Sequence, residues 1–127
     1  MIDHVSIAVR DLDGCARFYE AVLGALGYTK LVTRPGTVGF GKKYPEFWLN
    51  ERPAMTPVDT DAGTHICLRA SSIEMVQAFH NAALQGGGRS DGAPGPRQAT
   101  LGPYYAAFIR DPEGNKIEAA TFVAQPG

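Results

Sequence analysis

The strongest constraint on the fold is an internal repeat, in which the second half of the chain follows the first at an offset of 61 positions. The segment that starts at His4 resembles the segment that starts at His65, and four later residues recur at the same offset without a gap. These pairs are Phe18 with Phe79, Ala21 with Ala82, Leu23 with Leu84, and Gly27 with Gly88. A repeat of this length is typical of a duplicated supersecondary unit, so the sequence predicts two similar modules.

Each module is predicted to contain a strand, a helix and three more strands. Asp11 in the first half, and Ser71 with Glu74 as a capping box in the second, precede apolar residues at helical spacing. Alternating patterns and turn residues predict strands at 4–9, 29–33, 37–41 and 46–50, and then at 65–70, 88–89, 104–110 and 116–123. Two βαβββ modules make an α+β fold.

Segments rich in glycine and proline mark the boundaries between these elements. Residues 53–62 are interpreted as the linker between a first module at 1–52 and a second module at 63–127. Residues 91–103 are predicted to be a loop, either a lid over a site or a mobile segment.

Composition narrows the class of protein. The chain has 127 residues, a formal net charge of −1 and two cysteines without a C-x-x-C motif. There is no basic face for a nucleic acid, no apolar run of the roughly 20 residues that a membrane span needs, and no signal peptide. We therefore expect a cytoplasmic protein that binds a small molecule rather than a nucleic acid or a membrane.

The positions of two histidines give the first functional hypothesis. Side chains alternate between the faces of a sheet, and the apolar residues of both first strands should pack on the helices, so His4 and His65 should point to the opposite face. Glu118 in the last strand shares this parity and lies among small and apolar neighbours. Two imidazoles and a carboxylate suit an open site for a divalent metal, namely iron(II), manganese, nickel, cobalt or zinc. A structural histidine is the alternative for each position taken alone.

A family resemblance extends over nearly the whole chain. It is carried by the segments 4–9, 18–19 and 63–66 and by the ending 108–118, which has the pattern D-P-x-G-N-x-I-E. The chain resembles the vicinal oxygen chelate superfamily, which includes glyoxalase I, extradiol dioxygenases and bleomycin resistance proteins. The resemblance implies that the two modules curl into an eight-stranded mixed sheet that forms a cleft, with the helices outside. It also implies a homodimer and a metal, held by His4, His65 and Glu118, that chelates adjacent oxygens of the substrate.

The sequence departs from the glyoxalase pattern at one position. Glyoxalases of the family have a fourth ligand, usually Glu, on the last strand of the first module, where this chain has Trp48 or Leu49 and where Glu46 is displaced. The three-ligand set therefore resembles the dioxygenases more than the glyoxalases, although ring-cleaving dioxygenases are usually longer chains.

The remaining site candidates are aromatic and charged residues near the predicted cleft. Tyr104 and Glu46 are the candidates for proton transfer. Phe47, Trp48, Arg69 and Tyr105 are the candidates for substrate binding. Strand packing is the alternative for the tyrosines, and a surface salt bridge is the alternative for Arg69.

The sequence favours a divalent-metal-dependent enzyme of lyase, isomerase or dioxygenase type that acts on a small substrate. The alternative is a metal-free protein that binds and sequesters a small antibiotic-like molecule.

Overall fold

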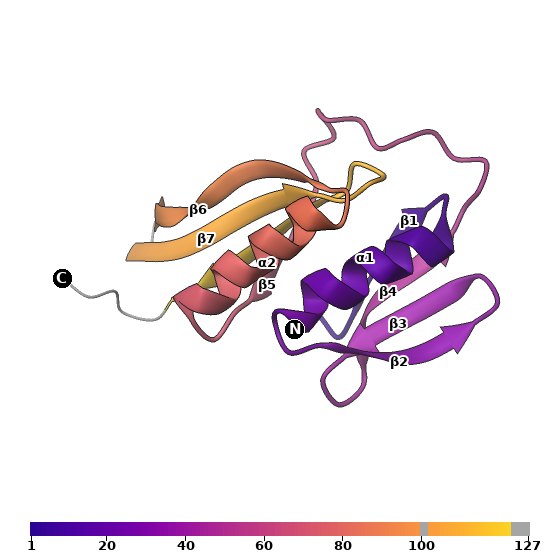
Figure 1. The fold of residues 1–127 in the computed structure, drawn as a ribbon, viewed down its shortest axis with the longest axis horizontal. Coiled ribbons are helices and arrows are strands. Elements are labelled where there is room, and N and C mark those ends of the chain that lie inside the picture. Colours follow the sequence, from indigo (N-terminus) through magenta and orange to yellow (C-terminus); the bar gives the residue numbers. More distant parts are fainter. Residues whose placement is uncertain (100–101, 123–127) are drawn as a thin grey trace.

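Two βαβββ modules follow one another along the chain, as the repeat predicts (Figure 1). The computed structural model describes residues 1–99 and 102–122, so the predicted end of the last strand at Val123 lies outside the described residues. The first module contains β1 (Val5–Val9), α1 (Leu12–Gly24), β2 (Thr29–Arg34), β3 (Thr37–Gly41) and β4 (Pro45–Glu51). The second contains β5 (His65–Arg69), α2 (Ile73–Gln85), β6 (Arg89–Ala99), β7 (Gly102–Arg110) and β8 (Lys116–Thr121). Residues 52–64 connect the modules without a helix or strand.

The two helices have the same length and begin 61 positions apart, as the repeat does. Asp11 caps α1 by accepting a hydrogen bond from the backbone N–H of Gly14 at 3.1 Å. Ser72, and not the predicted Ser71, caps α2 by accepting from the N–H of Met75 at 3.2 Å. The prediction was one residue early. Ser72 lies 61 positions after Asp11, so the offset of the repeat itself places the cap at Ser72. Neither helix is long and apolar enough to cross a membrane.

The eight strands form two four-stranded sheets, ordered β1-β4-β3-β2 and β5-β8-β7-β6. In each sheet the first strand is parallel to its neighbour, and the other pairs are antiparallel. The first strand of each module, β1 or β5, is therefore an edge strand within the chain. The predicted α+β fold of two βαβββ modules is confirmed, and within the described residues the eight strands lie in two four-stranded mixed sheets rather than in one eight-stranded sheet.

Residues 91–99 and 102–103 of the predicted loop belong instead to the long hairpin of β6 and β7, and residues 100–101 lie outside the described residues. Pairing runs from Arg89 opposite Arg110 to Ala99 opposite Gly102, with register shifts around Gly92. β6 is an edge strand, where a proline without an N–H donor does little harm. The glycines and prolines that suggested a loop are instead accommodated by these register shifts and by the free edge.

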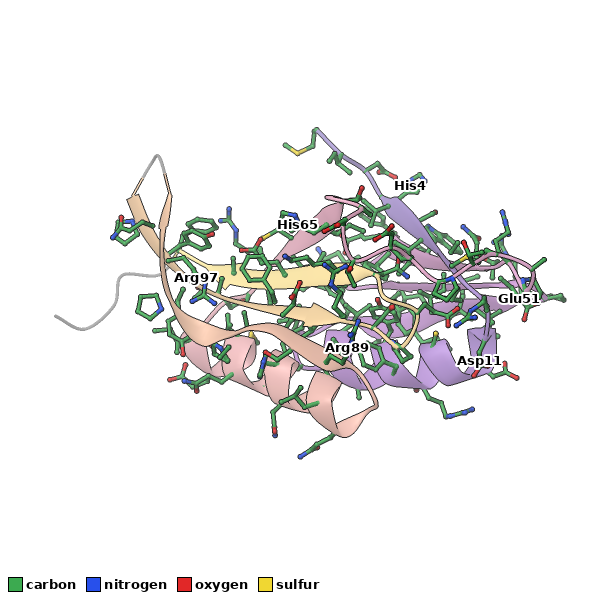
Figure 2. The ribbon with its side chains drawn as sticks, turned by 90° about the horizontal axis from the view of Figure 1, so that it is seen from above. His4, Asp11, Glu51, His65, Arg89 and Arg97 are labelled. Atoms are coloured by element: carbon green, nitrogen blue, oxygen red, sulfur yellow. The ribbon has the colours of Figure 1, made fainter. Side chains whose placement is uncertain are left out.

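The core lies between the helices and one face of each sheet. Its largest fully buried side chains include Tyr19, Leu23, Phe47, Phe79 and Ile109, which come from both modules. The helices also contact each other, so the two modules share one core. Seen from above, both helices lie on one side of the sheets, and His4 and His65 lie on the other (Figure 2). The predicted strand parity is therefore correct.

The turn between β7 and β8 is organised by a buried carboxylate. Asp111 accepts a hydrogen bond from the hydroxyl of Tyr19 in α1 at 2.6 Å, and others from the backbone N–H groups of Glu113 and Asn115 at 2.9 Å. Burial raises the pKa of Asp111, although the hydrogen bonds from Tyr19 and Asn115 act in the opposite direction. The donors around Asp111 offset the cost of burying a carboxylate.

The same turn joins the second module to the first. The side-chain amide of Asn115 donates to the carbonyl of Ala8 in β1 at 3.2 Å. Arg10 donates to the carboxylate of Glu113 from its backbone and its guanidinium, and Val58 in the linker donates to the Glu113 carbonyl. The D-P-E-G-N segment, which carried the most specific part of the family resemblance, is therefore the polar junction between the modules.

A pH-dependent contribution to stability is expected from His80, the third histidine. It is buried in α2, its Nε2 lies 2.7 Å from the Ser90 hydroxyl, and burial lowers its pKa. A folded pKa below the unfolded value means that stability is complete above the unfolded pKa and is lost as the pH falls through the folded pKa. Urea unfolding at about pH 7.5 and about pH 5 should show a smaller acid-induced loss for His80→Gln than for the wild type. An equal loss in both proteins would contradict this role.

Candidate functional site

His65 and Glu118 lie within hydrogen-bond distance of each other on the face of the second sheet that points away from the helices. The His65 Nε2 lies 3.0 Å from the Glu118 Oε1. The β5–β8 register places Cys67 opposite Glu118, so the glutamate reaches its neighbour on the edge strand. The Glu118 side chain is only 6% exposed, whereas that of His65 is 41% exposed. A buried carboxylate with one accessible imidazole beside it can bind a cation from the solvent side.

Side chains around this pair keep their protons near neutral pH. Burial, followed by the charge of Glu118, raises the pKa of the Tyr104 phenol. Burial, again followed by Glu118, raises the pKa of the Cys67 thiol to about 12, so Cys67 is not a nucleophile there. Phe108 contacts His65 with a ring separation of 5.8 Å. The Tyr104 ring stacks on Phe122, with the ring centres 5.4 Å apart.

Two arginines on this face stack on aromatic rings. The Arg69 guanidinium lies 4.7 Å from the centre of the Phe122 ring, and that of Arg97 lies 5.8 Å from the centre of Phe108. Within the described residues neither arginine has a carboxylate partner, so the salt bridge considered for Arg69 is not formed there. Sequence reasoning missed Arg97, because it lies in the segment that was predicted to be a loop.

His4 belongs to the other module and has a different partner. Its Nδ1 lies 2.8 Å from the Asp3 carboxylate, and it shares the helix-free side of the molecule with His65 (Figure 2). Across residues 1–99 and 102–122, no three His, Cys, Asp or Glu side chains come together as a metal-binding group. One chain thus brings together two of the three predicted ligands, and His4 stands apart.

Two of the predicted substrate-binding residues, Phe47 and Tyr105, face the core rather than the open face of their sheets. Phe47 is fully buried and packs against Tyr19 in the core, and Tyr105 packs against the core while its hydroxyl accepts a hydrogen bond from Gln77 in α2. Neighbouring residues in a strand face opposite sides, so only Trp48 and Tyr104 of each adjacent pair can lie on the open face. Glu46, in the other module from Glu118, accepts a hydrogen bond from the backbone N–H of Lys42 at 3.4 Å.

Trp48 occupies the position in the first module that Glu118 occupies in the second. Trp48 pairs with Ser6 in the β1–β4 register, and Glu118 pairs with Cys67 in the β5–β8 register. Ser6 and Cys67 are related by the repeat. The first module therefore has an indole beside its histidine where the second module has a carboxylate.

Comparison with known proteins agrees with this architecture. Residues 1–119 match the model of the Glyoxalase/Bleomycin resistance protein/Dioxygenase superfamily. The chain belongs to this superfamily. A solved glyoxalase/bleomycin resistance protein from Albidiferax ferrireducens T118 is 32% identical, with a TM-score of 0.84 over 94% of this chain and 97% of that one.

Two further similar proteins, with lower sequence identity to this chain, have different names. Virulence protein STM3117 of Salmonella typhimurium is 29% identical over 125 residues, which cover 96% of this chain and 84% of that protein. The fosfomycin resistance protein FosX from Mesorhizobium loti is 15% identical, with a TM-score of 0.68 over 95% of this chain and 91% of that chain, and so shares the fold. These names differ, so membership of the superfamily does not by itself specify a reaction.

Members of the superfamily commonly use divalent metals, and the donor set at His65 and Glu118 fits such an ion. An imidazole nitrogen and a carboxylate oxygen are ligands that iron(II), manganese, nickel, cobalt and zinc accept. Two ligands from one chain leave most of the coordination sphere open, so a stable site needs at least one further donor.

Proposed function

We propose that this protein is a divalent-metal-dependent enzyme of lyase, isomerase or dioxygenase type, which acts on a small substrate with two adjacent oxygen atoms. The observation that carries the proposal is the contact between His65 and the buried carboxylate of Glu118. Glu118 has no other charged partner in the described part of the chain. Bound at this pair, the metal would supply a Lewis acid that polarises the substrate oxygens.

The third ligand is His4 from a second copy of the chain. His4 stands apart from His65 and Glu118 within one chain, yet it lies on the same helix-free side. In a two-fold symmetric dimer each copy gives to the other what it receives, so two complete sites would form. The free edges of β1 and β5 carry His4 and His65 at or next to their ends, where a second copy can approach.

Three residues of this chain would serve the substrate. Tyr104 keeps its proton and lies close to Glu118, so it can protonate a developing enolate or alkoxide. Arg69 and Arg97, which lack carboxylate partners in the described segments, would hold an anionic part of the substrate. We expect the enzyme in the cytoplasm, where the free thiols of Cys15 and Cys67 would stay reduced.

The second candidate function is metal-free binding and sequestration of a small molecule. It is favoured by one observation: His65 and Glu118 already have each other as hydrogen-bond partners. In that case the aromatic rings and arginines on the same face would bind the ligand without an ion.

The metal content of protein purified without a chelator tests the proposal. We expect about one divalent ion per chain in the wild type and in His80→Gln, which removes an imidazole elsewhere, and a stoichiometry near zero in His65→Ala. The loaded protein should turn over at least one compound in a panel of dicarbonyls, catechols and epoxides. A stoichiometric ion that survives His65→Ala would exclude the site as described, and a ligand bound equally well by chelator-treated protein, without turnover, would favour sequestration.

A further inference from the structure

The first module has a pocket of its own, on the face that points away from α1. It measures about 620 Å³ and includes His4, Ser6, Arg34, Tyr44, Trp48 and Asn50 in its lining. Sequence reasoning identified only His4 and Trp48 among these residues, and the proposed function uses only His4.

The floor of the pocket is the indole of Trp48, whose six-membered ring lies close against Gly39 in β3. Trp48 pairs with Gly39 in the β3–β4 register. A Cβ atom at Gly39 would lie 2.8 Å from the nearest carbon of the Trp48 ring, so only glycine allows the ring this close to the strand. The other face of the partly exposed indole is then available to a flat ligand, which would gain stacking and burial.

One wall of the pocket carries a cation without a carboxylate partner. The Arg34 guanidinium lies over the Trp48 ring, 5.9 Å from its centre, which is at the outer limit of a cation–π contact. Among the described residues no carboxylate pairs with Arg34. Asp3, the acid in the lining, is already paired with His4. The wall therefore offers a positive charge to a ligand.

Neutral hydrogen-bond donors lie beside this charge. The Asn50 side chain lies at this wall, with its oxygen 2.8 Å from the Thr37 hydroxyl, which also lies 3.0 Å from the Leu49 carbonyl. Ser6 and Tyr44 add hydroxyl groups to the lining. A guanidinium, an amide and hydroxyls around a flat aromatic floor are complementary to a ring that bears a carboxylate.

We propose that the pocket of the first module binds a small aromatic carboxylate, with its ring on Trp48 and its carboxylate on Arg34 and Asn50. His4 lies in the same lining, so the bound ring would adjoin the ion of the proposed enzyme. This inference rests on the proposed function in one respect, namely that the aromatic carboxylate would be part of the substrate of the metal-dependent enzyme. Recognition of the aromatic carboxylate itself needs no metal.

Titration of the wild-type protein with benzoate tests the inference, because Trp48 is the single tryptophan of the chain and reports on its own pocket. We expect benzoate to change the Trp48 fluorescence with saturation. Benzamide, which lacks the charge, and cyclohexanecarboxylate, which lacks the flat ring, should each bind about tenfold more weakly. Equal binding of all three compounds, or no saturable response to benzoate, would overturn the inference.

Substitution of Arg34 separates a specific carboxylate site from general attraction of anions. Arg34→Met should weaken benzoate binding about tenfold, whereas Arg89→Met, an equal loss of charge on an exposed residue of the second module, should leave it unchanged. Both variants change exposed or partly exposed side chains, so both should fold. An unchanged benzoate affinity in Arg34→Met would contradict the assignment.

The same titration distinguishes failure of this inference from failure of the proposed function. Benzoate binding should persist in chelator-treated wild type and in His65→Ala, because neither change touches the pocket of the first module. A protein that binds benzoate but no metal would retain the aromatic pocket and lose the proposed enzyme. A protein that binds metal but not benzoate would support the proposed enzyme and contradict the aromatic-carboxylate pocket.

Discussion

Replacement of Glu118 by glutamine is expected to lower the affinity for divalent metal at least about 100-fold, because changes in the outer shell of such sites alone cost 10- to 100-fold. The amide keeps the size of the side chain but removes the buried charge that faces His65. Calorimetric titration of Mn²⁺ or Zn²⁺ into chelator-treated protein measures the change. Glu74→Gln, an exposed acid at the start of α2, is the matched control and should bind metal as the wild type does.

Mixing two inactive variants tests whether the site is shared between copies. Neither His4→Ala nor Glu118→Gln should bind metal tightly alone. If subunits exchange in an equal mixture, half of the dimers contain one chain of each kind, and each of these has one intact site, so about a quarter of all sites should recover. A labelled subunit verifies that the subunits exchange. If they exchange and no metal binding is recovered, a site that takes His4 from one copy and Glu118 from the other is excluded.

Replacement of Asp111 by alanine is expected to destabilise the protein by about 3 to 5 kcal/mol, because each buried donor left without an acceptor costs roughly 1 to 3 kcal/mol. The change removes the acceptor for the Tyr19 hydroxyl and for two backbone N–H groups, and it weakens the turn that joins the modules. Urea unfolding followed by circular dichroism gives the free energy. Asp13→Ala, an exposed acid in the first turn of α1, should cost about 1 kcal/mol or less. Similar losses for both variants would show that Asp111 is not the centre of the junction.

Much of the fold could be predicted from the repeat, because the repeated residues include the local signals that start helices and alternate along strands. Cap residues, helical spacing and strand alternation placed both helices and the face of His4, His65 and Glu118. The long hairpin of β6 and β7 could not be predicted in the same way. Its pairing is stabilised by a neighbouring strand and tolerates residues that locally favour a turn.

The site was less predictable than the fold, since it depends on side-chain contacts between distant segments. Phe47 was expected beside Trp48 on the open face, although alternation alone assigns one of them to the core. The arginines that stack on Phe108, Phe122 and Trp48 have no signature in the sequence, because nothing local specifies which ring an arginine will reach. Sequence parity could assign His4 to a face but could not place it within reach of Glu118.

The equivalence of Trp48 and Glu118 has a consequence for how such a chain can change over generations. A duplicated half-chain presents selection with two copies of one position, and here one copy holds an indole and the other a carboxylate. Under the two proposals above, mutations around Trp48 would alter which compound is accepted, while His4, His65 and Glu118 would preserve the chemistry. The first half of the gene would then diversify the ligand, whereas the reaction would depend on a histidine from each half.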